Sequence, residues 1–297
     1  MNILKNMVKT DESRNDAALR ALWPADGCEE HFVEFAVGGS NLRIATMTRG
    51  GRRAPIVFLH GFGSTKEDFA DIVRFRQFDD RPVIAFDAPG CGASECDDLS
   101  TISIPFLQQT AERVINHYGN SKFHLVGHSM GGLTALLLAH HNPSAVLSFT
   151  NVEGNLHSED CFLSRQIVEH AEQDPEHFMT AFVARTRQTS GFSCALYAAG
   201  LEHKVRTAAV RPIFRSIVDL SDHGDLLEKF VKLPFPRQFM YGDENRSLSY
   251  LARLQEHGVQ LSEIPQCGHF PMYANPLTMW RHIGDFIDRA ETELPHG

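Results

Sequence analysis

The stretch that decides the fold reads Phe123-His124-Leu125-Val126-Gly127-His128-Ser129-Met130-Gly131-Gly132. Its first four residues form an apolar run typical of a buried strand, and residues 133–139 form an apolar run typical of a helix. Between them lies the pattern G-x-S-x-G, whose glycines let strand and helix approach closely while Ser129 occupies a strained, exposed turn. The N-terminus of the following helix would add free N–H groups and a partial positive charge beside this serine. The stretch therefore predicts a strand, a sharp turn and a helix, with Ser129 as a nucleophile.

Strand and helix patterns alternate on both sides of this stretch. The predicted strands that come before or include it lie at 31–37 and 42–47, which form a hairpin, and at 56–59, 83–86 and 123–126. The predicted strands after it lie at 146–152, 238–241 and 259–264. The predicted helices between and after these strands lie near 65–77, 103–118, 246–257 and 276–291. Short, continuous apolar runs separated by helix-length segments indicate buried parallel strands joined by crossovers. The fold class predicted is α/β, with a mostly parallel central sheet flanked by helices.

The segment 155–232 departs from this alternation. Its apolar residues recur at helical spacing among charged residues, and it carries no strand pattern. We expect an inserted helical cap, most of whose aromatic residues form its own core while the rest line a mostly apolar pocket. The chain is thus divided into an N-terminal extension at 1–27, a core at 28–154 and 233–297, and the cap at 155–232.

Composition excludes several classes of protein. The 297 residues are 42% hydrophobic and carry a net charge of −9, so no basic excess is present to bind nucleic acid or an anionic membrane. No apolar run approaches the roughly 20 residues of a membrane span, and the first residues do not resemble a secretory signal. The six cysteines lack CxxC spacing and indicate reduced thiols, hence a cytoplasmic location. The 16 histidines show no metal-ligand spacing, and no metal site is expected.

A serine hydroxyl needs a nearby base to become a nucleophile. His269, just past the last predicted strand, is the candidate base. The landmarks along the chain are His60-Gly61-Phe62-Gly63, Asp87-Ala88-Pro89-Gly90-Cys91-Gly92-Ala93-Ser94, Gly127–Gly132, Tyr241-Gly242-Asp243 and Gly268-His269-Phe270-Pro271. With these landmarks in this order, the sequence resembles proteins of the α/β-hydrolase fold over nearly its whole length after residue 30.

The resemblance implies roles for further residues. The two oxyanion donors would be the backbone N–H groups of Phe62 and Met130. The resemblance also implies an acid that completes a catalytic triad with Ser129 and His269. This acid is harder to assign, because its usual position, three residues after Gly242, holds the neutral Asn245. A subset of the fold places the acid after the preceding strand, where this chain has Glu153. We favour Glu153, with Asp243 as the alternative acid.

A serine nucleophile narrows the reaction. Relatives that displace halide or open epoxides use an aspartate at this turn, whereas Ser129 with a histidine suits acyl transfer. We predict a serine hydrolase without cofactor that cleaves an ester, lactone or thioester of a small-molecule acyl substrate through an acyl-enzyme on Ser129. The same fold also hosts C–C hydrolases, lyases and cofactor-free dioxygenases, and a slow-turnover ligand receptor is a further alternative. The sequence leaves open whether the chain forms a homo-oligomer.

Overall fold

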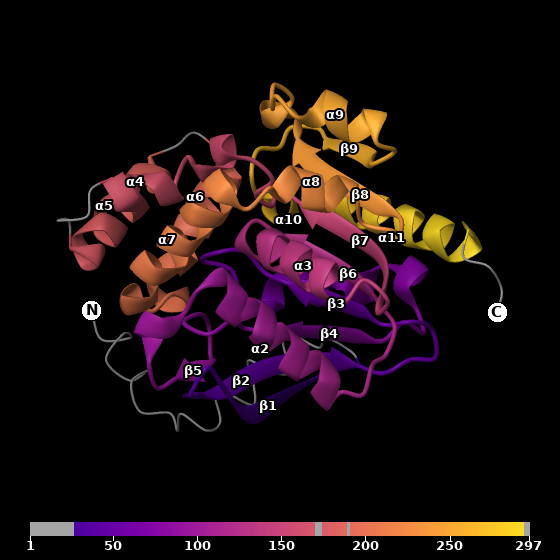
Figure 1. The fold of residues 1–297 in the computed structure, drawn as a ribbon, viewed down its shortest axis with the longest axis horizontal. Coiled ribbons are helices and arrows are strands. Elements are labelled where there is room, and N and C mark those ends of the chain that lie inside the picture. Colours follow the sequence, from indigo (N-terminus) through magenta and orange to yellow (C-terminus); the bar gives the residue numbers. More distant parts are fainter. Residues whose placement is uncertain (1–26, 170–173, 189–190, 294–297) are drawn as a thin grey trace, which may run out of the picture.

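The strands expected from the apolar runs pair into one sheet in the computed structural model, which describes residues 27–169, 174–188 and 191–293 (Figure 1). The strands are β1 (Cys28–Val37), β2 (Ser40–Arg49), β3 (Ile56–Leu59), β4 (Val83–Phe86), β5 (Glu95–Cys96), β6 (Phe123–His128), β7 (Val146–Val152), β8 (Arg237–Gly242) and β9 (Gln260–Ile264). Their order is β1-β2-β4-β3-β6-β7-β8-β9, and β5 pairs with β2. The pairs from β4 through β9 are parallel and those of β2 are antiparallel. The predicted α/β-hydrolase fold class, with a mostly parallel sheet, is confirmed.

Helices cover both faces of the sheet. The α-helices are α2 (Ile104–His117), α3 (Met130–His141), α4 (Ser164–Glu169), α5 (Pro175–Arg187), α6 (Phe192–Lys204), α7 (Thr207–His223), α8 (Leu226–Val231), α9 (Leu251–Glu256), α10 (Pro271–Ala274) and α11 (Pro276–Glu293). The 3₁₀ helices are η1 (Lys66–Arg74), η2 (Arg76–Phe78), η3 (Leu99–Thr101), η4 (Ser158–Cys161) and η5 (Asp243–Asn245). Figure 1 shows α2, α3 and α8 on one face of the sheet and α11 on the other.

The continuous apolar runs follow from this two-sided cover. Successive strand residues point to opposite faces, so Val57 belongs to the core beneath α2 and α3, whereas Phe58 belongs to the core beneath α11. Phe58 packs edge-on against Trp280 of α11, with the ring centroids 5.7 Å apart. The central strands β3 and β4 therefore carry apolar residues at every position, and helices pack on both faces of the sheet there.

The helices α4 to α8 occupy the chain between β7 and β8, where the sequence predicted only helices. Figure 1 shows α4, α5, α6 and α7 gathered at one end of the sheet. The end of α6 is tied to the loop after β4, because the Gly92 N–H donates to the Lys204 carbonyl at 2.9 Å. The next turn is tied to the same loop by the Arg206 N–H, which donates to the Gly90 carbonyl at 2.8 Å.

Two predicted helices differ from the structure. The helix expected at 65–77 is instead the pair of 3₁₀ helices η1 and η2, because Phe75 between them adopts an extended backbone with φ −111° and ψ 110°. The helix expected at 246–257 is only the short α9. The predicted extension at 1–27 lies almost wholly outside the described residues.

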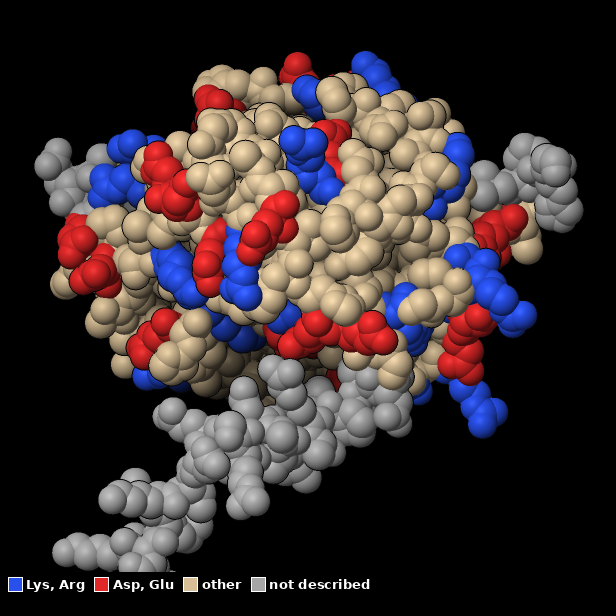
Figure 2. All heavy atoms as spheres, turned by 90° about the horizontal axis from the view of Figure 1, so that it is seen from below, with Lys and Arg blue, Asp and Glu red and all other residues tan. Residues whose placement is uncertain are grey.

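The surface carries charges of both signs. Figure 2 shows one face on which basic side chains lie beside acidic ones and neither gathers into a single broad patch. Within the described ranges, none of the helices combines the length and the apolar character that crossing a bilayer requires.

Candidate active site

The turn around Ser129 is strained and tightly packed. Ser129 follows β6 directly and precedes α3. Its backbone has φ 51° and ψ −120°, a combination that residues other than glycine rarely adopt. Gly131 is required in the first turn of α3, because a Cβ there would overlap the carbonyl oxygen of Leu59 and lie 2.5 Å from that of His60. The predicted strand–turn–helix unit is thus present and presents the serine at the carboxyl end of a central strand.

The structure brings His269 to this serine across 140 residues of sequence. Its Nε2 lies 2.9 Å from Ser129 Oγ, a hydrogen-bond distance. The ring stands in the loop between β9 and α10 and is one-fifth exposed. Phe162 and Phe270 pack edge-on against it. An imidazole held this way, with Nε2 accepting from the serine hydroxyl, is placed to take up the proton.

Glu153 lies on the other side of the imidazole. It follows β7 directly with φ 53°, and its Oε2 is 3.6 Å from His269 Nδ1, an ion-pair distance. Its carboxylate is 5% exposed and accepts hydrogen bonds from the Gly242 N–H at 2.6 Å and from the Asn245 side chain at 3.0 and 2.9 Å. Buried carboxylates need such donors. Asn245, which holds the position where the resemblance usually places an acid, therefore donates to the Glu153 carboxylate.

Asp243 is engaged elsewhere. Its Oδ1 accepts a hydrogen bond from the Cys267 N–H at 3.0 Å, and its other oxygen lies 3.6 Å from Arg246. The Cys267 N–H lowers the pKa of this partly exposed carboxyl, with Arg246 contributing in the same direction. Of the two acids named from the sequence, Glu153 is the one beside His269.

Phe62 and Met130 line the same pocket as Ser129. Met130 opens α3, so its N–H belongs to the free donors of a helix N-terminus. The Phe62 N–H shares a peptide unit with the Gly61 carbonyl, which accepts a hydrogen bond from His60 Nδ1 at 2.8 Å. His60 Nε2 in turn accepts from the Ala88 N–H at 2.8 Å, which fixes the tautomer with the proton on Nδ1. Because the C=O and N–H of a trans peptide point in opposite directions, anchoring the Gly61 carbonyl fixes the direction of the Phe62 N–H.

His128 is a site residue that sequence reasoning missed. Its Nε2 donates to the backbone carbonyl of His269 at 2.8 Å, so the residue before Ser129 holds the loop that carries His269. Burial lowers the pKa of His128 to about 3, with the nearby His269 contributing, and the ring is therefore neutral. The only sequence signal was its position inside the G-x-S-x-G pattern.

A cavity of about 400 Å³ opens over Ser129. Core residues supply its floor, and the segment 155–232 supplies most of its walls. The wall residues of this segment are Asn155, Asp160, Phe162, Leu163, Ser164, Phe182, Thr186, Cys194, Tyr197, Phe214 and Ile217. The described part of the chain contains no cluster of three or more His, Cys, Asp or Glu side chains suited to a metal ion.

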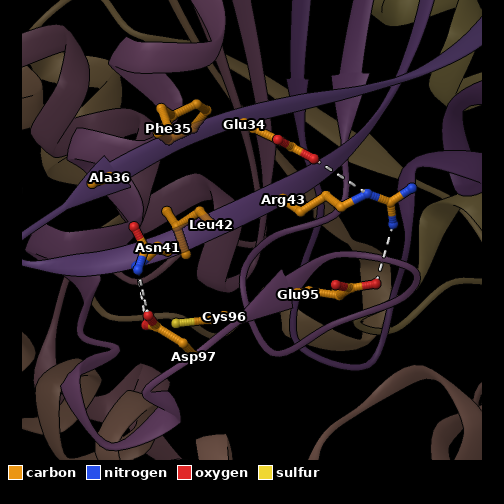
Figure 3. Close-up of a pocket in the computed structure, with 9 residues that line it drawn as sticks. All are labelled: Glu34, Phe35, Ala36, Asn41, Leu42, Arg43, Glu95, Cys96 and Asp97. Carbon is orange, nitrogen blue, oxygen red and sulfur yellow. Dashed lines mark hydrogen bonds and ion pairs between the residues drawn. The ribbon is translucent and has the colours of Figure 1, made fainter.

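A second hollow lies on the outer strands β1, β2 and β5 and shares no residue with the Ser129 pocket (Figure 3). Its charged groups pair with one another: Arg43 lies 3.8 Å from Glu34 and 3.1 Å from Glu95, and the Asn41 side chain donates to Asp97 at 2.8 Å. These groups are already satisfied, and the pocket over Ser129 is the candidate active site.

Comparisons with known proteins agree with this fold. The family model of the alpha/beta hydrolase fold matches residues 54–195. Monoacylglycerol lipase abhd6-A of Xenopus laevis is 23% identical over 303 residues, which cover 91% of this chain and 89% of that protein. The chain therefore has the α/β-hydrolase fold.

The proteins that are similar to this chain differ in the reactions they are named for. A 2-succinyl-6-hydroxy-2,4-cyclohexadiene-1-carboxylate synthase of Enterobacter sp. (strain 638) is 27% identical, with 81% of this chain and 94% of that protein covered. A structure from a study of carboxylesterases of Nitrososphaera gargenis superimposes with a TM-score of 0.73 at 13% identity, covering 88% of this chain and all of that one. The similarity therefore indicates the fold, and the reaction must be argued from the site.

Proposed function

We propose that this protein is a serine hydrolase that cleaves a carboxylic ester-type bond through an acyl-enzyme on Ser129. The observation that carries the proposal is the 2.9 Å contact between His269 Nε2 and Ser129 Oγ at a strained turn. A serine hydrogen-bonded to an imidazole, with an acid behind the imidazole, is the arrangement that activates a hydroxyl for acyl transfer. The names of relatives that are lipases and esterases agree with it.

The steps follow from the contacts. Ser129 Oγ attacks the carbonyl carbon while His269 Nε2 accepts the hydroxyl proton. Glu153, the acid in this proposal, stabilises the imidazolium by its charge. The negative oxygen of the tetrahedral intermediate accepts hydrogen bonds from the N–H groups of Phe62 and Met130. His269 then gives its proton to the leaving alkoxide or thiolate, and the acyl group remains on the serine.

The second half of the reaction repeats the first with water. His269 removes a proton from water, the hydroxide attacks the acyl-enzyme, and the carboxylic acid is released as the proton returns to Ser129. No cofactor takes part in either half.

We infer that residues 155–232 act as a cap over this site, with 28–154 and 233–297 as the catalytic core. The apolar rings of Phe162, Phe182 and Phe214 in the cavity wall favour a small or medium acyl or aryl group over a polymer. Ester, lactone and thioester bonds all meet the needs of the mechanism, and a panel of the three with varied acyl length identifies the preferred one.

The test uses a fluorophosphonate probe and turnover of p-nitrophenyl butyrate. We expect the probe to label the native chain and not Ser129→Ala, and ester turnover to fall in that variant by at least about 10³-fold. Equal labelling of both proteins, or turnover that survives in Ser129→Ala, would refute the proposal. Labelling of Ser129 without turnover on any ester, lactone or thioester would point instead to a ligand receptor.

A further inference from the structure

Helix α6 touches the loop that carries one of the proposed oxyanion donors. We call residues 60–64 the oxyanion loop. The Tyr197 hydroxyl, on α6, donates to the carbonyl oxygen of Phe62 at 2.9 Å. Tyr197 is only 4% exposed, so water does not compete for this carbonyl. Burial also raises the pKa of the Tyr197 hydroxyl, which therefore keeps its proton and remains a donor.

The two peptide units on either side of Phe62 are held from different parts of the molecule. The unit before Phe62 is held by the core, because the Gly61 carbonyl accepts from His60 Nδ1 at 2.8 Å and from the Ser64 N–H at 3.1 Å. The unit after Phe62 is held by Tyr197. Removing the second anchor frees the Phe62 carbonyl and the chain after it, so the loop is held from one side only and the place of the Phe62 N–H in the pocket is less well fixed.

The contact between α6 and the loop is close enough to need a glycine. Gly63 has φ +75°, and a Cβ at this position would lie 2.6 Å from Tyr197 Oη and overlap Leu201. The helix therefore packs directly on the backbone of the loop. This close packing is a second observation, independent of the hydrogen bond, that α6 and the oxyanion loop are held in one relative position.

The ring of Tyr197 contacts the other half of the machinery. It stacks on Phe270 with the centroids 4.3 Å apart, and Phe270 follows His269 in the chain and packs edge-on against its ring. One side chain of α6 thus contacts both the loop of the oxyanion donor and the neighbour of the base.

We propose that Tyr197 is a positioning residue that ties α6 to the oxyanion loop, so that the Phe62 donor is fully formed only when α6 is seated on the core. The proposal rests on the proposed function for its catalytic part, whereas its structural part concerns the order of the loop alone. The donor would strengthen in the transition state, where the oxygen is charged, so its loss lowers kcat rather than raising KM.

The test compares Tyr197→Phe with Tyr273→Phe. Tyr273 is a matched control, because its ring lies on Phe270 with the centroids 6.0 Å apart while its hydroxyl donates to Asp68 at 2.8 Å. For Tyr197→Phe we expect kcat on a short ester to fall about tenfold with KM little changed. The affinity for a trifluoromethyl ketone, whose adduct carries an oxyanion, should fall in proportion. Tyr273→Phe should leave both quantities near their native values.

Amide hydrogen exchange supplies a readout that does not need turnover. The amides of Phe62 and Gly63, which Tyr197 contacts, should exchange faster in Tyr197→Phe and not in Tyr273→Phe. If Tyr197→Phe does not fold, Lys204→Met loosens the far end of α6, where Lys204 lies 3.5 Å from Asp68, and should raise exchange in the same loop.

The outcomes separate the two proposals. Unchanged kcat and unchanged loop exchange in Tyr197→Phe overturn the positioning role, and so does a rise in KM alone, which would make Tyr197 a pocket wall only. A native protein without turnover on any ester, lactone or thioester refutes the proposed function, while faster loop exchange in the variant would still support the tie between α6 and the loop.

Discussion

Replacing Glu153 by glutamine tests which acid supports the imidazolium. Glutamine keeps an oxygen for the Gly242 N–H and removes the charge that faces His269 at 3.6 Å. Two unit charges at that distance attract by about 4–5 kcal/mol at an effective dielectric constant of about 20. Since the His269 side chain is 21% exposed, solvent screening lowers this to roughly 3–4 kcal/mol. That energy corresponds to a fall in kcat of about 10² to 10³-fold.

The assay is kcat and kcat/KM on p-nitrophenyl butyrate, with thermal unfolding as a check that the variant folds. Asp243→Asn is the matched control: its asparagine oxygen still accepts from the Cys267 N–H, and the lost charge faces only Arg246. We expect that control to stay within about threefold of the native rate, because exposed ion pairs contribute little. A larger loss in Asp243→Asn than in Glu153→Gln would refute the assignment of the acid.

Two further predictions concern stability. Because His128 has a pKa of about 3 when folded and about 6.5 when unfolded, the unfolded chain binds more protons below pH 6.5. The free energy of unfolding should therefore fall as pH drops from 7 to 5, by about 2 kcal/mol from this ring alone. Denaturant unfolding of His128→Gln should show a correspondingly smaller fall, and equal falls would contradict the neutral, buried ring. Gly131→Ala should unfold at a clearly lower temperature, since its Cβ would overlap the Leu59 carbonyl, whereas Gly50→Ala, with nothing within 4 Å, should not. Equal melting temperatures for both variants would contradict the packing at the turn.

The parts of the fold that could be predicted are those with a local cause. Continuous apolar runs such as Ile56–Leu59 occur where both faces of a strand are buried, so the sequence pattern follows directly from the burial. The glycines around Ser129 are likewise needed because the strand and the helix approach each other closely there. The break at Phe75 between η1 and η2 was not predictable, because nothing in the local sequence indicates that this apolar residue at helical spacing has an extended backbone.

The site was predictable to the extent that each residue has a motif of its own. Ser129 and His269 stand in recognisable turns, and the structure brings them together. The choice of Glu153 or Asp243 as the acid was left open from the sequence. It depends on which backbone N–H groups donate to each carboxylate, and those donors come from distant segments of the chain. His128 and Tyr197 act through contacts with segments far away in the chain, which no local pattern records.

The division of the pocket between its floor and its walls bears on how relatives could diverge. The proposed attacking atoms belong to loops of the sheet, whereas most of the surface that would recognise an acyl group comes from one continuous stretch of chain between β7 and β8. Grafting that stretch from a relative should exchange substrate preference without rebuilding the chemistry. The graft has one requirement: a phenol, or an equivalent donor, must still reach the main chain at residue 62.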